Sequence, residues 1–149
     1  GYMEQLADSG RYQVSAQMHK KIQELVAAGC CDDGQASRTI ERVWQQFDYL
    51  IDPHTAVAFH VLEEYRESTG DRTPALVVST ASPFKFCTSV LSALGVEEHR
   101  PGTEVLDQLA QHTGVPVPAP LAALKGKVCR FDGVTERDGM REQVLEFLR

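Results

Sequence analysis

Apolar residues recur every three or four positions along several stretches of this sequence, the spacing of a helix that buries one face. One such stretch covers residues 16–28, with Ser15 as its cap and Gly29 as its stop, and a second covers residues 36–47. The side chains expected to face the core are Met18, Ile22, Leu25 and Val26 in the first, and Ile40, Val43, Trp44 and Phe47 in the second.

Two further helices are predicted from their boundary residues. One is capped by Asp52, has Pro53 at its first helical position and ends at Gly70. The next begins at Ser82 and Pro83 and runs to Leu94. Shorter helices are expected from Thr103 to Gly114, in the stretch PLAALK, and over residues 137–148 with Met140, Val144, Leu145 and Leu148 facing inward.

A different pattern, apolar without alternation, occurs in the stretch ALVVS at residues 75–79. Such a run is typical of a strand covered on both faces in an α/β protein. A second strand is expected at residues 128–131, and because two strands make a poor sheet, further strands are expected outside these residues. The predicted fold is therefore α/β and mostly helical, with helices packed around a few parallel strands, and residues 1–149 forming a single unit of a longer chain.

Composition excludes several classes of function. With a net charge of −6, the chain has no basic stripe for a nucleic-acid backbone, and no apolar run approaches the roughly 18 residues of a membrane span. The four cysteines, at positions 30, 31, 87 and 129, show neither CxxC nor metal-ligand spacing. We therefore expect free thiols in a reducing cytoplasm and no metal site.

The stretch STASPFKF, residues 79–86, is the first candidate for chemistry. Ser79 and Thr80 end the predicted strand and precede a helix start, the edge at which α/β proteins collect ligands and anions. Lys85 lies in the first turn of that helix, where an anion would balance its charge. Spacing alone favours a plainer interpretation, in which Ser82 is a helix cap and Lys85 is solvated.

The stretch DPHTAVA, residues 52–58, is the second candidate. Capping explains Asp52 and Pro53 but leaves His54 and Thr55 unexplained. His54 and His60 are six residues apart and would lie on different faces of a helix, so a shared metal is not expected. Common nucleotide-binding and hydrolase motifs are absent, and no catalytic residue is assigned.

Taken together, the stretches SGRYQVS, YLIDPHTAVA and YRESTGDRTPALVVSTASPFKF resemble the C-terminal part of the threonine synthase family. The similarity runs from about Tyr2 to the final predicted helix, in the same order and spacing. The DPHTA and STASPxKF motifs are specific only in combination. Ser82 stands where other branches of the family carry histidine.

The resemblance implies a fold-type II enzyme that uses pyridoxal 5'-phosphate to convert O-phospho-L-homoserine and water to L-threonine and phosphate. It implies that Thr80, with Ser79 next to it, donates a hydroxyl to the cofactor's ring nitrogen, and that His54 and Lys85 are candidates for substrate binding. The family's Schiff-base lysine lies upstream of the matched region, so these residues alone are expected to be inactive without the missing N-terminal part of the same chain.

Two other functions remain open from the residues themselves. The chain could be a non-catalytic α/β module that holds an anionic metabolite at the helix starting near Pro83. It could also be a structural domain whose uncovered apolar face is an interface.

Overall fold

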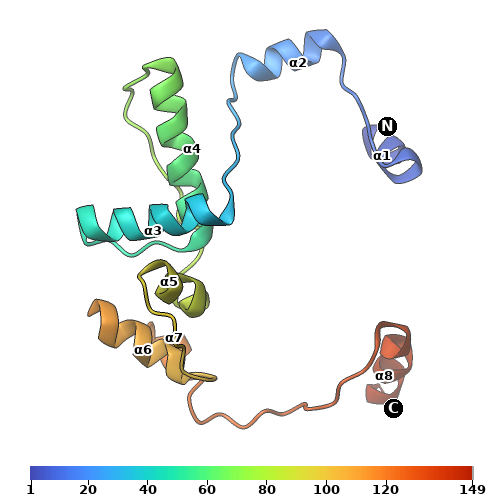
Figure 1. Ribbon diagram of the computed structural model, residues 1–149. Coiled ribbons are helices and arrows are strands. Elements are labelled where there is room, and N and C mark those ends of the chain that lie inside the picture. Colours follow the sequence, from blue (N-terminus) through green and yellow to red (C-terminus); the bar gives the residue numbers. More distant parts are fainter. Residues whose placement is uncertain (149) are drawn as a thin grey trace. The chain divides into compact units, whose positions relative to one another are not determined.

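The computed structural model describes residues 1–148, and every regular element within them is helical (Figure 1). The residues group into two compact units, 1–116 and 117–149. The helices of the first unit are α1 (Tyr2–Ser9), α2 (Ala16–Gln23), α3 (Asp33–Phe47), α4 (Pro53–Thr69), the short 3-10 helix η1 (Pro83–Lys85), α5 (Cys87–Ala93) and α6 (Glu104–Thr113). Those of the second are α7 (Ala119–Ala122), η2 (Arg137–Gly139) and α8 (Met140–Phe147).

Helix α3 crosses α4 near the N-terminal end of α4 (Figure 1). Asp32 and Gln35 form a reciprocal capping box at the start of α3. Away from the core, Arg42 on α3 makes a two-pronged ion pair with Glu63 on α4, one arm of which joins Nη1 and Oε1 at 2.7 Å. Because the guanidinium and carboxylate forks match in shape, this pair sets the orientation of the two helices.

The core of the first unit lies where α5 packs against both α3 and α6. Its side chains are those that the helical periodicity places on one face of each helix. The largest of them, with almost no exposed surface, are Ile40 and Val43 on α3, Val90 and Leu91 on α5, and Leu109 on α6. This core supports the start of α4 and the residues that lead into α5.

The prediction of an α/β fold with parallel strands is wrong: no strand occurs anywhere in residues 1–148. The segment expected to be a strand, residues 75–79, has no regular structure, and Leu76 and Val78 are 90% and 66% exposed. Residues 128–131 likewise have no regular structure, and Val128 is 88% exposed. A strand exists only through hydrogen bonds to a neighbouring strand, and no described segment offers one.

The segment after α4, residues 70–79, is nevertheless fixed against α4 by hydrogen bonds. It runs back along α4, with the Arg66 guanidinium donating to the Thr73 carbonyl at 3.0 Å and Thr55 in contact with Ser79 near the start of the helix. Eleven helical residues separate Thr55 from Arg66, a rise of about 16 Å. Six residues rise about 9 Å in a helix and reach at most about 22 Å, so the segment from Thr73 to Ser79 is more extended than a helix.

The first predicted helix is shorter than its apolar stripe suggests. Ser15 caps α2 as expected, accepting from the backbone N–H of Met18 at 3.2 Å, but the helix ends at Gln23. Gly29 is not its stop. A Cβ at Gly29 would lie 2.8 Å from Cγ1 of Val61 on α4, so the glycine is needed where this connection passes close to α4.

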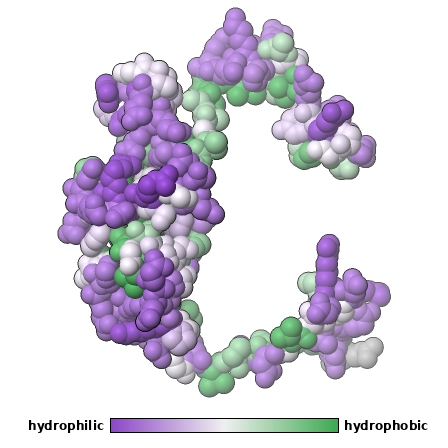
Figure 2. Space-filling model, viewed as in Figure 1, coloured by the Kyte–Doolittle hydropathy of each residue, from purple (hydrophilic) through white to green (hydrophobic). Residues whose placement is uncertain are grey.

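The apolar faces predicted for the first and last helices are largely uncovered. The side chains predicted to face inward are exposed: Met18, Ile22, Leu25 and Val26 in and after α2, and Met140, Val144, Leu145 and Leu148 in and after α8. Figure 2 shows apolar surface along the connection between α2 and α3. None of the helices within residues 1–148 combines the length and apolar character that crossing a bilayer requires.

Candidate functional site

The N-terminus of α4 is built around a fully buried carboxylate, Asp52. Its Oδ1 accepts the backbone N–H of His54 at 2.9 Å, which is the predicted helix cap, and Pro53 follows at the first helical position. Gly70 ends the helix with φ 73°, as predicted. Asp52 has no exposed surface, whereas a cap normally lies at the surface, so its carboxylate has a further role.

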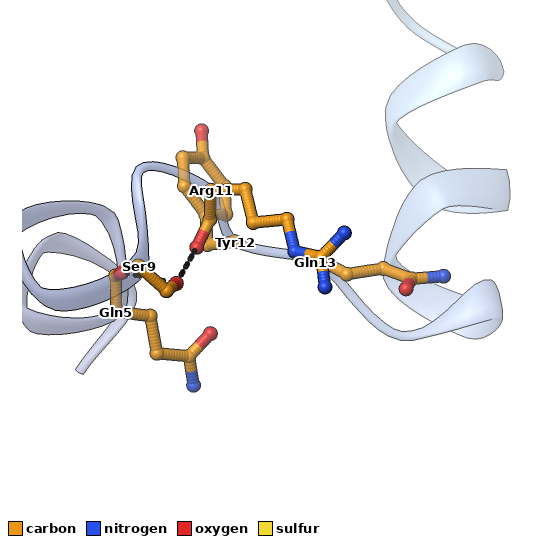
Figure 3. Close-up of a pocket in the computed structure, with 5 residues that line it drawn as sticks. All are labelled: Gln5, Ser9, Arg11, Tyr12 and Gln13. Carbon is orange, nitrogen blue, oxygen red and sulfur yellow. Dashed lines mark hydrogen bonds between the residues drawn. The ribbon is translucent and has the colours of Figure 1, made fainter.

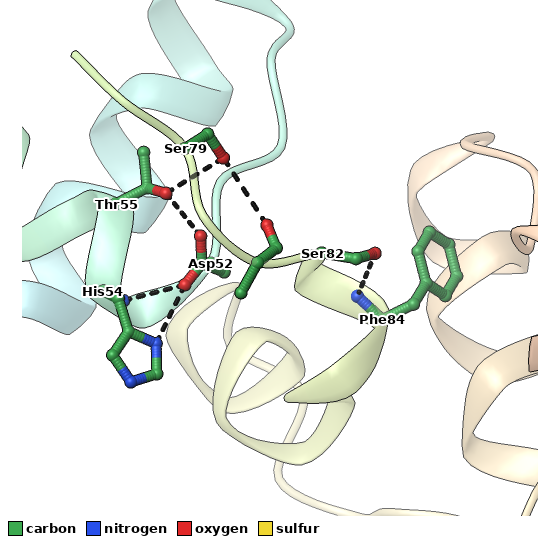
Figure 4. Close-up of polar contacts among 7 residues, drawn as sticks. Asp52, His54, Thr55, Ser79, Ser82 and Phe84 are labelled. Carbon is green, nitrogen blue, oxygen red and sulfur yellow. Dashed lines mark hydrogen bonds and ion pairs between the residues drawn. The ribbon is translucent and has the colours of Figure 1, made fainter.

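A chain of hydroxyl groups joins Asp52 to the STASPFKF stretch (Figure 4). The Thr55 hydroxyl donates to Oδ2 of Asp52, and its Oγ1 lies 3.1 Å from Oγ of Ser79. A carboxylate only accepts, so the single Thr55 proton points to Asp52. The single Ser79 proton is then shared between the Thr55 oxygen and the Ala81 carbonyl, which lies 3.5 Å from Ser79 Oγ. The two motifs, 24 residues apart in sequence, therefore meet through Thr55 and Ser79.

His54 makes a second connection between the same two stretches. Its Nδ1 lies 3.0 Å from Oδ1 of Asp52, and its ring centroid lies 4.9 Å from that of Phe86, with the planes tilted by 58°. The His54 side chain remains 64% exposed. The imidazole is thus held at one edge and beside one face while still open to a ligand.

The other predicted site residues lie along the same loop. Ser82 caps η1 by accepting from the Phe84 N–H at 3.3 Å (Figure 4), and Lys85 is exposed at the end of η1. Thr80 is also exposed and is not part of the hydroxyl chain formed by Thr55 and Ser79. The single helix predicted from Pro83 to Leu94 is divided at Phe86 into η1 and α5, so only a three-residue turn begins at Pro83.

Hydrogen bonding controls the charge of Asp52. Burial alone would raise the pKa of this carboxyl, but the hydrogen bonds from Thr55 and His54 together outweigh burial and lower its pKa below the usual range. Asp52 is therefore ionised at neutral pH. A buried charge of this kind is tolerated because all of its neighbours donate to it.

The lowered pKa of Asp52 predicts a loss of stability in acid. A carboxyl whose pKa is lower in the folded state stabilises the protein fully above its unfolded value of about 3.9, and this stabilisation is lost as the pH falls through the folded value. Asp52→Asn, which keeps a good helix cap, should flatten the fall of the unfolding free energy between about pH 5 and pH 2.

Urea unfolding of this chain across that range measures the effect, with Asp71→Asn as the matched control. The pKa of Asp71 is also lowered, first of all by the Thr73 backbone N–H, but Asp71 is solvated and its contribution is screened. An acid limb equally steep in wild type and Asp52→Asn would contradict the prediction.

A cavity in the first unit is lined mainly by residues of the SGRYQVS stretch and by none from the DPHTA or STASPFKF stretches. It has a volume of about 550 Å³ and is lined by polar and aromatic side chains around the end of α1: Gln5, Ser9, Arg11, Tyr12 and Gln13 (Figure 3). No group of three or more potential metal-ligating side chains gathers within residues 1–148. All four cysteines are free thiols, and burial raises the pKa of Cys87.

Sequence reasoning located the two stretches but missed the residues that join them. Asp52 was interpreted only as a cap, and Phe86 was given no role. One signal was available: a threonine three residues after an N-cap aspartate is placed to donate to the carboxylate that already caps the helix. The contact between Phe86 and His54 has no such local signal.

The sequence was compared with protein families and with proteins of known structure. Residues 55–144, more than half of the chain, match the family model described as threonine synthase, C-terminal. A mouse protein named threonine synthase-like 1 is 30% identical over 100 residues, covering 66% of this chain and 13% of that protein. Threonine synthase of Corynebacterium glutamicum is 36% identical over 75 residues, covering 50% of this chain and 15% of that protein.

A solved threonine synthase structure also matches this chain. The crystal structure of pyridoxal-phosphate-bound threonine synthase from Brucella melitensis superimposes with a TM-score of 0.58 at 34% identity. The match covers 74% of this chain and 23% of the Brucella chain. The chain thus spans about an eighth to a quarter of the length of the proteins it matches.

Proposed function

Because the chain belongs to the threonine synthase family, matching its C-terminal region, we propose that residues 1–149 are the C-terminal part of a longer threonine synthase. That enzyme converts O-phospho-L-homoserine and water to L-threonine and phosphate with pyridoxal 5'-phosphate. The observation that carries the proposal is the meeting of the DPHTA and STASPFKF stretches through Thr55 and Ser79.

The residues of the loop suit a cofactor that carries an aromatic ring nitrogen. The Ser79 hydroxyl contacts Thr55 and the Ala81 carbonyl, whereas Thr80, exposed like Ser79, takes no part in these contacts. We assign Thr80 as the hydroxyl donor to the ring nitrogen, with Ser79 holding the loop in place for it. When bound, pyridoxal phosphate would serve as the electron sink for elimination of phosphate and addition of water.

A hydroxyl partner differs chemically from a carboxylate partner. An aspartate would stabilise a protonated ring nitrogen, whereas a neutral threonine leaves the nitrogen largely unprotonated and moderates its electron withdrawal. Thr80 therefore tunes the cofactor by supplying a hydrogen bond without a charge.

The substrate carries a phosphate monoester, for which His54 and Lys85 are the proposed contacts. Lys85 immediately precedes Phe86, the ring that lies beside His54, so the chain brings both side chains to the same part of the loop. His54 is in the first turn of the 17-residue helix α4, where the backbone dipole favours an anion. The earlier alternative, anion capture at the helix start near Pro83, loses its basis because η1 has only three residues.

Phosphate release from O-phospho-L-homoserine tests the proposed function directly. With pyridoxal phosphate present, we expect turnover from the native-length product of the gene and none from residues 1–149, because the family's Schiff-base lysine lies upstream. The two samples are compared at equal concentration. Turnover by residues 1–149 would place the essential lysine among these residues, and no turnover by either would overturn the proposed activity.

A further inference from the structure

Asp52 makes more hydrogen bonds than a helix cap needs. A cap is complete with one backbone N–H, supplied here by His54 at 2.9 Å. The same carboxylate also contacts the His54 ring through Nδ1 at 3.0 Å and accepts the Thr55 hydroxyl. An exposed carboxylate would cap the helix equally well, so the complete burial of Asp52 is accounted for by its side-chain partners.

These contacts determine where the His54 ring carries its proton. An ionised carboxylate has no proton to donate, so the 3.0 Å contact is a hydrogen bond only if Nδ1 of His54 carries one. We propose that Asp52 is a positioning residue for His54, holding its Nδ1–H so that Nε2 is directed to the phosphate group of the substrate. The inference rests on the proposed function for the identity of that substrate, but not for the position of the proton.

The ring is held in two directions at once. The hydrogen bond to Asp52 lies in the plane of the imidazole and limits its rotation, and Phe86 packs beside the ring at a tilt of 58°. Figure 4 shows the second ring nitrogen on the side away from Asp52. Since the side chain is 64% exposed, Nε2 is oriented without being covered.

This orientation suits an anionic ligand. With the Nδ1 proton given to Asp52, a phosphate group binds at Nε2 through one further proton shared between that nitrogen and a phosphate oxygen. Because Asp52 occupies the Nδ1 edge of the ring, the ligand can approach only from the Nε2 edge. A histidine without Asp52 would divide its proton between the two nitrogens and rotate more freely, which weakens binding of the phosphate.

Nitrogen NMR of the native-length protein, labelled with [15N]histidine, tests the position of the proton. His54→Gln identifies the His54 signals, and because that side chain is exposed the variant should fold normally. We expect wild-type Nδ1 to carry a proton. Asp52→Ser keeps a good helix cap but its shorter side chain withdraws the acceptor from the ring, so it should shift the population toward the Nε2–H form. An unprotonated Nδ1 in wild type, or an unchanged ring in Asp52→Ser, would overturn the proposal.

Thr55→Val is the matched control, because it removes the other side-chain partner of Asp52 and leaves the His54 contact in place. The variant should keep the wild-type ring proton, so a general loss of structure is distinguished from a specific effect. Loss of the Nδ1 proton in Thr55→Val as well would count against a specific Asp52–His54 link.

Steady-state kinetics give a second measurement. Asp52→Ser and His54→Gln should each raise KM for O-phospho-L-homoserine about tenfold, and the double variant should be no worse than His54→Gln. Multiplicative effects in the double variant would show that Asp52 acts independently of His54 and would overturn the positioning role. If the native-length protein releases no phosphate, the proposed activity fails, while the NMR result still decides the position of the proton.

Discussion

Thr80→Val in the native-length enzyme is expected to slow phosphate release about ten- to hundredfold. The substitution keeps the shape of the side chain but removes the hydroxyl proposed to donate to the cofactor's ring nitrogen. Removing the donor leaves the neutral ring nitrogen without a partner inside the site, which costs about 1–3 kcal/mol and corresponds to about this range of rates. The absorption spectrum of the bound cofactor should shift as well.

Two controls make the Thr80 measurement specific. Thr80→Ser retains the hydroxyl and should keep most of the activity. Thr80 is exposed and outside the hydroxyl chain, so the urea midpoint of Thr80→Val should equal that of wild type. Wild-type rates together with a wild-type spectrum in Thr80→Val would disprove the ring-nitrogen role.

Leu91→Ala should cost about 2–5 kcal/mol of unfolding free energy. Leu91 is completely buried on α5, the helix that packs against both α3 and α6. Truncating it removes apolar contacts and leaves a cavity where those helices meet, and both effects destabilise the fold. Urea unfolding of residues 1–149 measures the change, and a loss below about 1 kcal/mol would mean that this core is poorly packed.

Leu76→Ala is the comparison for Leu91→Ala. Leu76 is 90% exposed, so the same truncation should change the stability of residues 1–149 by no more than about 0.5 kcal/mol. In the native-length protein the two variants should become more alike if residues outside 1–149 cover this segment. A Leu76→Ala variant that remains neutral at full length would argue against that coverage.

Ser79 and Thr80 differ in their contacts with the hydroxyl chain. Ser79 and Thr80 are adjacent and chemically similar, and sequence alone places both at the cofactor. Thr55 separates their roles, since its oxygen lies 3.1 Å from Ser79 and its proton is directed to Asp52. Ser79 is therefore already engaged by Thr55 and Ala81, whereas the Thr80 hydroxyl takes no part in these contacts.

Sequence by itself determined the features that depend on neighbouring residues. Asp52, Pro53 and Gly70 set the bounds of α4 because a cap, a fixed φ and a left-handed residue act within one turn of the helix. The DPHTA and STASPFKF stretches, and the family to which they belong, were likewise readable from their order and spacing.

Tertiary structure decided everything that needs a partner distant in sequence. Residues 75–79 have the composition of a strand, but no described segment pairs with them, so the α/β prediction failed. The apolar stripe beyond Gln23 did not extend α2, because an apolar face supports a helix chiefly by packing. The contacts of Ser79 with Thr55 and of Phe86 with His54 arise because the chain turns back along α4 and brings two loops to one helix end.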